Sequence, residues 1–213
     1  LDSVKLARMP DESDFDVPAP VESGTVRARV MRVIENHVET RTEWAELPVE
    51  EGKVRLDPDQ DVCKISVIER HGKSGGHAVG FVGGLGFQKP AALATTVAHD
   101  SHNLMVMGNS EALMTRAARA VAESRGGVAV ATEAGITLLP LPLAGLMSTE
   151  PYEVVAEQSR AVSEALAEAG CDLNYAFMTL SLLALVVLRE LHISDKGLVE
   201  VGETGFGLVE LTP

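Results

Sequence analysis

The order of apolar patterns along the chain is the feature that most limits its fold. Residues 25–34 alternate apolar and polar side chains with a period of two, which predicts a strand. Similar segments follow before the first helical pattern begins. The first strand is predicted to continue through residues 36–41, and residues 47–56 are predicted to form a hairpin around Glu51-Gly52. Further strands are predicted at 62–70, 91–100, 103–108, 127–132, 136–141 and 206–211.

Three segments show helical patterns instead. Ser110 is a suitable N-cap for a helix that runs to about Ser124. Thr149 is expected to cap a second helix, with Pro151 in its first turn and Gly170 at its end. The length of the apolar segment 177–190 favours a buried helix over a strand. Because strands and helices do not alternate regularly, we expect an α+β layered domain with a mixed or antiparallel sheet and about three helices.

Residues 1–24 differ in composition from the rest of the chain and are interpreted as a linker or arm, which leaves residues 25–213 as the domain. The first segment holds three prolines and six acidic residues. Phe15 and Val17 are its expected anchors. The chain begins with Leu1 and not with Met, which favours a piece of a longer protein.

Composition narrows the classes of partner. The net charge of −13 argues against binding nucleic acid or an anionic membrane surface, and it favours a small neutral substrate or another protein. Aromatic residues make up only 4% of the chain, so the core must be aliphatic. Cys63 and Cys171 lack CxxC spacing and are expected to be reduced core residues of a cytoplasmic protein. The apolar stretch 180–188 is too short to span a bilayer.

The most unusual polar segment is His99-Asp100-Ser101-His102-Asn103, between two apolar strands. A carboxylate beside a histidine can fix its tautomer and raise its basicity, which is the physical case for a site. On an extended chain, His99 and Ser101 would point one way while Asp100 and His102 point the other. The alternative is a polar turn whose side chains cap the strand ends by hydrogen bonding.

A glycine-dense segment at 72–87 is the second candidate, with His71, His77, Gly83 and Gly84 as its loop residues. It does not match the phosphate-binding pattern GxxxxGK[ST], and a close-packed turn system or a loop over a neighbouring pocket is preferred. A metal site built from the histidines at 71, 77, 99 and 102 is conceivable, but no HxH or HExxH spacing supports it. We therefore assign no metal to this chain.

Several strings of the chain together resemble one known family. They are DVCKISVIERHGKSGGHAVGFVGGLGF, VAHDSHNLMVMG, LPLPLAGLMS, FMTLSLLAL and ISDKGLVEV, in that order. They are similar to segments of the C-terminal domain of bacterial and archaeal adenine deaminases, and the resemblance spans about residues 25–201.

The resemblance implies membership of the amidohydrolase superfamily and the hydrolysis of adenine to hypoxanthine and ammonia. In that family the chemistry belongs to a binuclear Mn or Fe centre in a (β/α)₈ barrel. A barrel takes about 250 residues, and this chain has no HxH pair, so the metal ligands cannot be carried over to any position here. What carries over is the segment 99–103 and the glycine loop before it, as substrate-proximal or interface candidates.

Partners follow from the same resemblance. We expect an N-terminal metal-dependent barrel domain, a purine in the intact enzyme, a homo-oligomer, and an apolar surface meant for the barrel or a second subunit. The chain alone is expected to be inactive. The alternative is a free-standing, non-catalytic binding or scaffold domain of the same fold.

Overall fold

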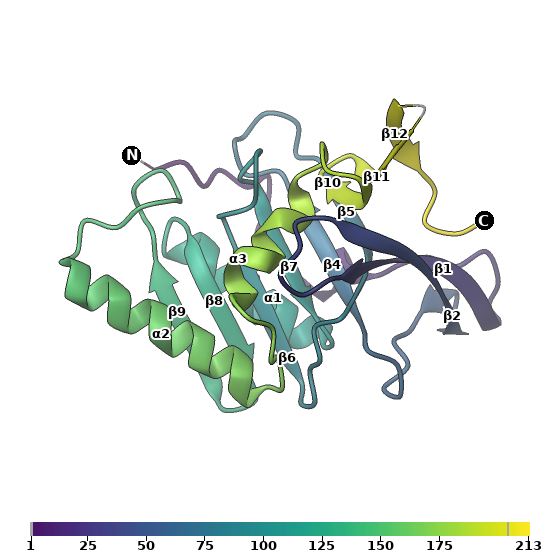
Figure 1. Ribbon diagram of the computed structural model, residues 1–213, viewed down its shortest axis with the longest axis horizontal. Helices are drawn as coiled ribbons and strands as arrows, with labels where there is room; N and C mark the ends of the chain where they lie inside the picture. Colours follow the sequence, from purple (N-terminus) through teal and green to yellow (C-terminus); the bar gives the residue numbers. More distant parts are fainter. Residues whose placement is uncertain (1, 204) are drawn as a thin grey trace.

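The chain folds around one large sheet that has helices on both faces (Figure 1). The computed structural model describes residues 2–203 and 205–213. Within these residues it contains three α-helices, two short 3₁₀ helices, a nine-stranded sheet and a three-stranded sheet. The expected α+β class with a mixed sheet is confirmed.

The large sheet runs in the order β3-β2-β1-β5-β4-β7-β6-β8-β9. Only the β1–β5 pair is parallel among the described strands of this sheet. Its strands are β1 (Ser23–Val33), β2 (Thr40–Glu50), β3 (Lys53–Val54), β4 (Val62–Ile68), β5 (His77–Gly83), β6 (Ala91–Thr95), β7 (Leu104–Gly108), β8 (Gly127–Thr132) and β9 (Gly135–Pro140). The small antiparallel sheet consists of β10 (Glu190–Ser194), β11 (Gly197–Gly202) and β12 (Gly205–Val209).

The predicted hairpin at 47–56 is confirmed, because Val49 of β2 pairs with Val54 of β3 across Glu51-Gly52. The predicted continuation of the first strand through 36–41 is wrong. The chain reverses after Val33 and returns antiparallel as β2. The predicted final strand agrees with β12, which pairs with β11.

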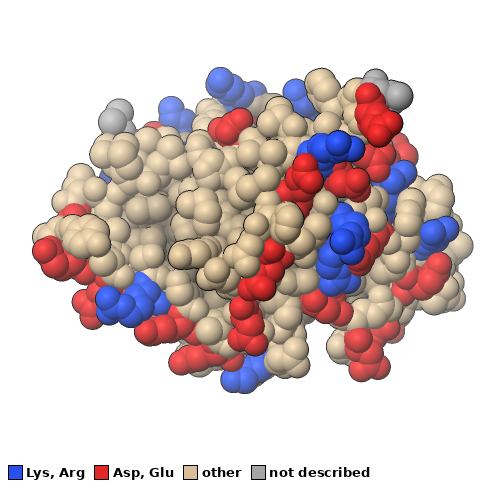
Figure 2. All heavy atoms as spheres, viewed as in Figure 1, with Lys and Arg blue, Asp and Glu red and all other residues tan. Residues whose placement is uncertain are grey.

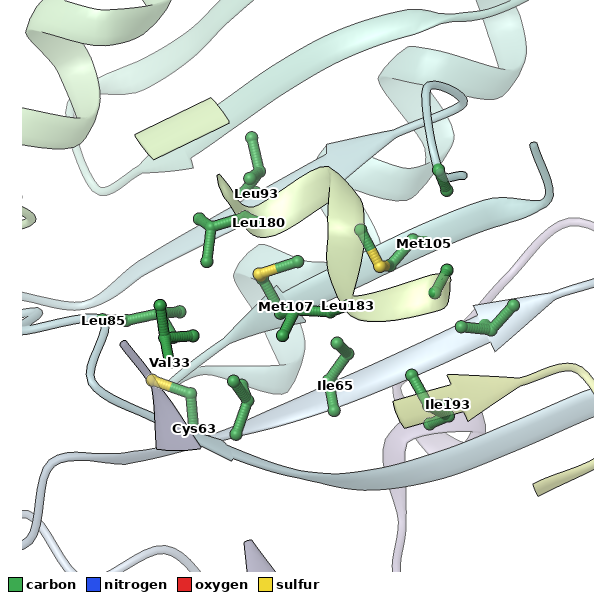
Figure 3. Close-up of a cluster of buried hydrophobic side chains, with 14 of the residues drawn as sticks. Val33, Cys63, Ile65, Leu85, Leu93, Met105, Met107, Leu180, Leu183 and Ile193 are labelled. Atoms are coloured by element: carbon green, nitrogen blue, oxygen red, sulfur yellow. The ribbon is translucent and has the colours of Figure 1, made fainter. Parts of the chain in front are cut away.

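Helices cover the two faces of the sheet unequally. One face carries α1 (Glu111–Glu123) and the 3₁₀ helix Glu12–Phe15; the other carries α2 (Tyr152–Glu168), α3 (Ala176–Ser181), the 3₁₀ helix Leu182–Ala184 and the small sheet. Successive residues of β7 show the division. Leu104 and Val106 join the cluster under α1, while Met105 and Met107 join the cluster under α3 (Figure 3). The central strands are therefore buried on both faces.

Strand β4 is buried on both faces, although its alternation of apolar residues with Lys64 and Ser66 is typical of a strand with one face on the core. Lys64 and Ser66 are both fully buried, on the face of the sheet that carries α1. The Nζ atom of Lys64 lies 2.7 Å from Oε1 of Glu111, in the first turn of that helix. Burial alone would raise the pKa of Glu111, but the hydrogen bond from Lys64 lowers it below its usual value. The Lys64–Glu111 pair therefore connects helix α1 to strand β4, at positions where the sequence pattern indicated exposure to solvent.

The glycine-dense segment 72–87 contains a central strand, β5, and is not simply a turn system. Its glycines are needed because other groups approach the strand closely. A Cβ on Gly80 would lie 3.0 Å from Cδ2 of Leu198 in β11, so the small sheet packs directly on this strand. Glycine content therefore concealed a strand that pairs with both β1 and β4.

The helices were predicted with mixed success. Helix α1 is confirmed, with the Oγ atom of Ser110 accepting the backbone N–H of Leu113. Helix α2 also exists, but Pro151 is its N-cap and the expected capping by Thr149 is wrong. The segment 177–190 is not one buried helix. It holds the end of α3 and a 3₁₀ helix, and then leads into β10, which sequence analysis missed together with β11.

Residues 2–24 contact the rest of the chain at several points. Phe15 and Val17 are buried, as expected for anchors. The backbone N–H of Lys5 donates to the carbonyl oxygen of Arg70 at 2.7 Å. Cys63 and Cys171 are both buried and unbonded, as expected. In the part of the chain that the structure describes, no helix has the length and hydropathy needed to cross a membrane.

Candidate functional site

Sheet topology places the two candidate segments at the same edge. The segment His99–Asn103, here called the histidine turn, connects β6 to β7. Ile68, at the end of β4, pairs with Leu104 at the start of β7 and with His77 at the start of β5. The loop 69–76 between β4 and β5 therefore lies beside the histidine turn.

The histidine turn is a compact turn, and its side chains do not alternate as they would on an extended chain. The backbone N–H of His102 donates to the carbonyl oxygen of Ala98 at 2.6 Å. This closure brings the rings of His99 and His102 to a centroid separation of 5.5 Å. Asp100 and Ser101 are exposed, the two histidines are half-buried, and Asn103 is buried. The expectation that the histidines point to opposite sides is wrong.

Both imidazoles have hydrogen-bond partners other than Asp100, the acidic residue that lies between them in the sequence. The Nδ1 atom of His102 accepts the backbone N–H of Ala98 at 3.2 Å, so its neutral form carries the proton on Nε2. The Nδ1 atom of His99 lies 3.3 Å from Oγ of Ser181 in α3. Burial lowers the pKa of His102, with further lowering from His99 and Arg70 and a partial opposing effect from Asp100. His102 is therefore a neutral hydrogen-bond donor at neutral pH.

The side chain of Arg70 supports the histidine turn through hydrogen bonds. The residue is 1% exposed. It donates from Nε to the carbonyl oxygen of His102, from Nη1 to Oγ of Ser3 at 2.8 Å, and from Nη2 to the carbonyl oxygen of Ala144 at 3.2 Å. A Cβ on Gly145 would lie 2.9 Å from the guanidinium carbon, so only glycine leaves room for it. Burial lowers the pKa of Arg70.

Asn103 links the histidine turn to two further segments. Its Oδ1 atom accepts the backbone N–H of Arg70 at 3.4 Å, and its Nδ2 atom donates to Oδ1 of Asp195 at 3.2 Å. Asp195 belongs to the tight turn between β10 and β11. The side chain of Asn103 thus joins three segments that are distant in sequence: the histidine turn, the segment after β4 and the β10–β11 turn.

Glu69 organises the first half of the glycine loop. Its carboxylate accepts backbone N–H groups from Lys73 at 3.0 Å and from Ser74 and Gly75 at 3.1 Å, and also one from His71. Burial alone would raise the pKa of Glu69, but these donors lower it to about 2. The amide cluster, which elsewhere would suit an external anion, is filled by the protein's own carboxylate.

The four loop candidates do not form one group. His71 joins the histidine turn, because its Nε2 atom lies 2.8 Å from the carbonyl oxygen of Ser101. His77 lies on β5, and its Nε2 atom contacts Oγ of Ser66 at 3.0 Å. Gly83 and Gly84 lie at the opposite end of β5, where the backbone N–H of Gly84 donates to Asp61 at 2.9 Å.

The histidines do not form a metal centre within residues 2–203 and 205–213. No three His, Cys, Asp or Glu side chains come together there in a way that could hold an ion. The ring nitrogens of His71, His77, His99 and His102 named above instead contact carbonyl, hydroxyl or amide groups of the protein. The donor set therefore does not fit the binuclear centre that the family resemblance implies, and no chemical step is assigned to a metal on this chain.

A pocket of about 570 Å³ lies at the other end of the sheet, away from the histidine turn. Its lining includes Asp61, Phe87, Asn109 and Glu133. Gly83 and Gly84 adjoin this end and not the histidine turn. The pocket and the histidine turn are thus separate features.

Sequence reasoning missed Arg70, Glu69 and Ser181 as the residues that shape the turn. The sequence offered one signal, since Glu69 and Arg70 are adjacent charges directly after a buried strand, where both must find partners. Ser181 had no comparable signal, because its partner His99 lies 82 positions earlier in the chain.

The sequence of the chain matches one family model and several known proteins. The family model described as "Adenine deaminase C-terminal domain" matches residues 37–204. An adenine deaminase of Rubrobacter xylanophilus is 66% identical over 99% of this chain. Adenine deaminases of Mesorhizobium japonicum and Moorella thermoacetica are 43% and 45% identical over 98% and 92% of it. The chain spans about a third of the length of each of these relatives.

Proposed function

Because the chain belongs to the adenine deaminase C-terminal domain family, we propose that it is the C-terminal portion of an enzyme that hydrolyses adenine to hypoxanthine and ammonia. It acts there joined to an N-terminal metal-dependent barrel and is inactive alone. Within it, residues 1–24 form the arm and residues 25–213 the domain. The intact enzyme is a cytoplasmic homo-oligomer in purine catabolism, with a binuclear Mn or Fe centre in the barrel to activate the attacking water.

The role of this chain is to supply the histidine turn to the purine or to the rim of its pocket. One observation carries this assignment: the turn is fixed from below by the buried Arg70, while Asp100 and Ser101 remain exposed. A turn needed only to cap strand ends would direct its polar side chains to the strands. Here the Nε2–H group of His102 and the carboxylate of Asp100 offer a donor and an acceptor, which match the mixed donors and acceptors of a purine edge.

The test uses a full-length chimera, in which this chain replaces the matching segment of the R. xylanophilus enzyme. We expect His102→Ala and His99→Ala to lower kcat/KM by about 10- to 100-fold, the effect of losing one hydrogen bond worth roughly 1.5–3 kcal/mol to a charged or reacting group. Metal content should not change, and each variant should stay folded at the assay temperature although it loses one hydrogen bond within the protein. His37→Ala, at an exposed histidine between β1 and β2, is the matched control. Normal kcat/KM in both test variants would mean that the histidine turn is structural.

A further inference from the structure

We propose that the surface around α3 and the first half of α2 is the site on which the barrel portion of the intact enzyme docks. This surface, here called the tyrosine face, is defined by Met147, Tyr152, Tyr175 and Met178. The proposal rests on the proposed function for the identity of its occupant. It adds where on this chain the barrel binds and which side chains bind it.

The side chains of the tyrosine face are unusually exposed for their type. The whole chain has two tyrosines, and both lie here, with Tyr152 81% and Tyr175 78% exposed. Met147 and Met178 are 54% and 50% exposed. Tyrosine and methionine are enriched in protein interfaces, because each buries a large area on contact. The chain has only 4% aromatic residues, and neither of its two tyrosines contributes to its own core.

Helix α2 points to a missing partner. Its buried residues, Val162 and Leu166, lie in its second half. None of the residues 152–161 is fully buried: Val155 packs only partly against the core, and Val154 is 38% exposed. In Figure 1 this first half projects past β9 at the edge of the sheet. A helix that served only to cover the sheet would bury an apolar stripe along its whole length.

The distribution of charged side chains on the surface also supports a docking site near α3. In a chain of net charge −13, the area over α3 is almost free of lysine, arginine and acidic side chains (Figure 2), whereas the first half of α2 carries Glu153, Glu157 and Arg160. Charged side chains gather instead along the lower edge of this view and over its right half. Depletion of charge at the centre, with charged groups at the rim, is the pattern of a protein interface.

Two observations select the barrel as the occupant. The relatives are about three times as long as this chain, which matches their C-terminal domain, so about two thirds of each relative lies outside the match. Arg70 donates both to Ser3 and to Ala144, so Ser3 lies close to the segment that leads, three residues later, to Met147 of the tyrosine face. A preceding domain would therefore enter next to this face. Contact between Ser181 and His99 also places the histidine turn at the border of α3.

Hydrogen–deuterium exchange of the isolated chain and of the full-length chimera tests the proposal directly. We expect amides in α3 and residues 152–161 to exchange about tenfold or more slowly in the chimera, because docking suppresses local opening. Amides of β12 should exchange equally in both proteins. Equal exchange of α3 in both proteins would overturn the proposal. Protection already present in the isolated chain, together with a dimer by light scattering, would assign the face to a second copy and also overturn it.

Paired substitutions identify the side chains. We expect Tyr152→Asp with Tyr175→Asp, made in the chimera, to abolish the protection of α3 and to separate thermal unfolding into two transitions. Phe206→Asp with Leu208→Asp is the matched control, since these side chains are 80% and 64% exposed on β12. The control should keep the protection. Equal behaviour of the two double variants, whether harmless or disruptive, would refute the assignment.

The two proposals fail in different ways. If the unmodified chimera shows protected α3 amides but does not release ammonia from adenine, docking stands and the proposed function fails. If the chimera is active and α3 exchanges as fast as in the isolated chain, the function stands and the docking surface lies elsewhere.

Discussion

Arg70 is the residue on which the shape of the histidine turn depends. Its guanidinium donates to carbonyl or hydroxyl oxygens of Ser3, His102 and Ala144 while almost completely buried. We expect Arg70→Ala to lower the free energy of unfolding by about 2–5 kcal/mol, because several buried acceptors lose their donor. Urea unfolding of the isolated chain measures this loss. Arg160→Ala, at an exposed position of α2, should change stability by less than about 0.5 kcal/mol. Similar losses in the two variants would contradict this role.

His192 makes the stability of the chain depend on pH. It is fully buried in β10, and neither ring nitrogen has a hydrogen-bond partner among the described residues. Burial lowers its pKa from 6.5 to about 4. The unfolded chain therefore binds a proton that the folded chain resists, and stability falls as pH drops from about 6.5 towards 4.

The size of this effect follows from the pKa difference. Between about pH 7.5 and about pH 5, His192 should cost about 2 kcal/mol of stability. In His192→Leu that part of the pH dependence should disappear, while His37→Leu should retain it. Urea unfolding at the two pH values provides the measurement. A pH profile unchanged in His192→Leu would show that this histidine is not the group responsible.

At the scale of single residues, the sequence predicted which side chains are unusual but not what they contact. His99 and His102 stood out as polar residues between apolar strands. Their partners, Ser181 and Ala98, arise from chain closure and from a helix 82 positions away. Spacing along the chain carries no information about such contacts, so the tautomer of His102 and the support from Arg70 required the fold.

The ion pair between Lys64 and Glu111 connects strand β4 to helix α1. Lys64 is fully buried, and the side chain of Glu111 is 30% exposed. Glu111→Ala leaves a buried ammonium group without its carboxylate, so we expect a loss of about 3 kcal/mol or more. Lys64→Met in the same chain should recover most of that loss, because the charge is then gone.

A double-mutant cycle by chemical denaturation measures the coupling between the two side chains. The pair of the half-buried Arg55 and the exposed Glu50, with side chains 34% and 72% exposed and nearest atoms 3.8 Å apart, gives the control, and Glu50→Ala should cost less than about 1 kcal/mol. Failure of Lys64→Met to rescue Glu111→Ala would mean that the loss comes from the helix terminus and not from the stranded charge.

Elements with a strong local signal were predicted well, and elements defined by their neighbours were not. Alternation of Val26, Ala28 and Val30 identified β1, and Ser110 identified the start of α1. Strand β5 was concealed by glycines whose purpose is to admit β11. Strand β10 was missed because it directly follows the apolar segment 177–190, where periodicity cannot separate a short helix from a strand. Strand β11, which pairs with β10, was missed with it.

At the scale of the whole molecule, the proposed division of labour with a metal-dependent barrel determines what this chain can do alone. We expect the isolated chain to release no ammonia from adenine, with or without added Mn²⁺ or Fe²⁺. The reason lies in the donor set: in the described residues no three potential ligands converge, and the four histidines near the glycine loop contact protein groups. Without a metal to lower its pKa, water is a poor nucleophile towards a purine at neutral pH.

A sensitive ammonia assay, with the full-length R. xylanophilus enzyme as positive control, checks this expectation. Circular dichroism must show that the isolated chain is folded, so that a lack of turnover reports missing chemistry and not missing structure. Adding the chain to a folded barrel portion distinguishes an absent active site from an incomplete one, because turnover should then reappear only if the tyrosine face is intact. Metal-dependent turnover by the chain alone would place a catalytic centre within these residues, and the assignment of the chemistry to the barrel would have to be abandoned.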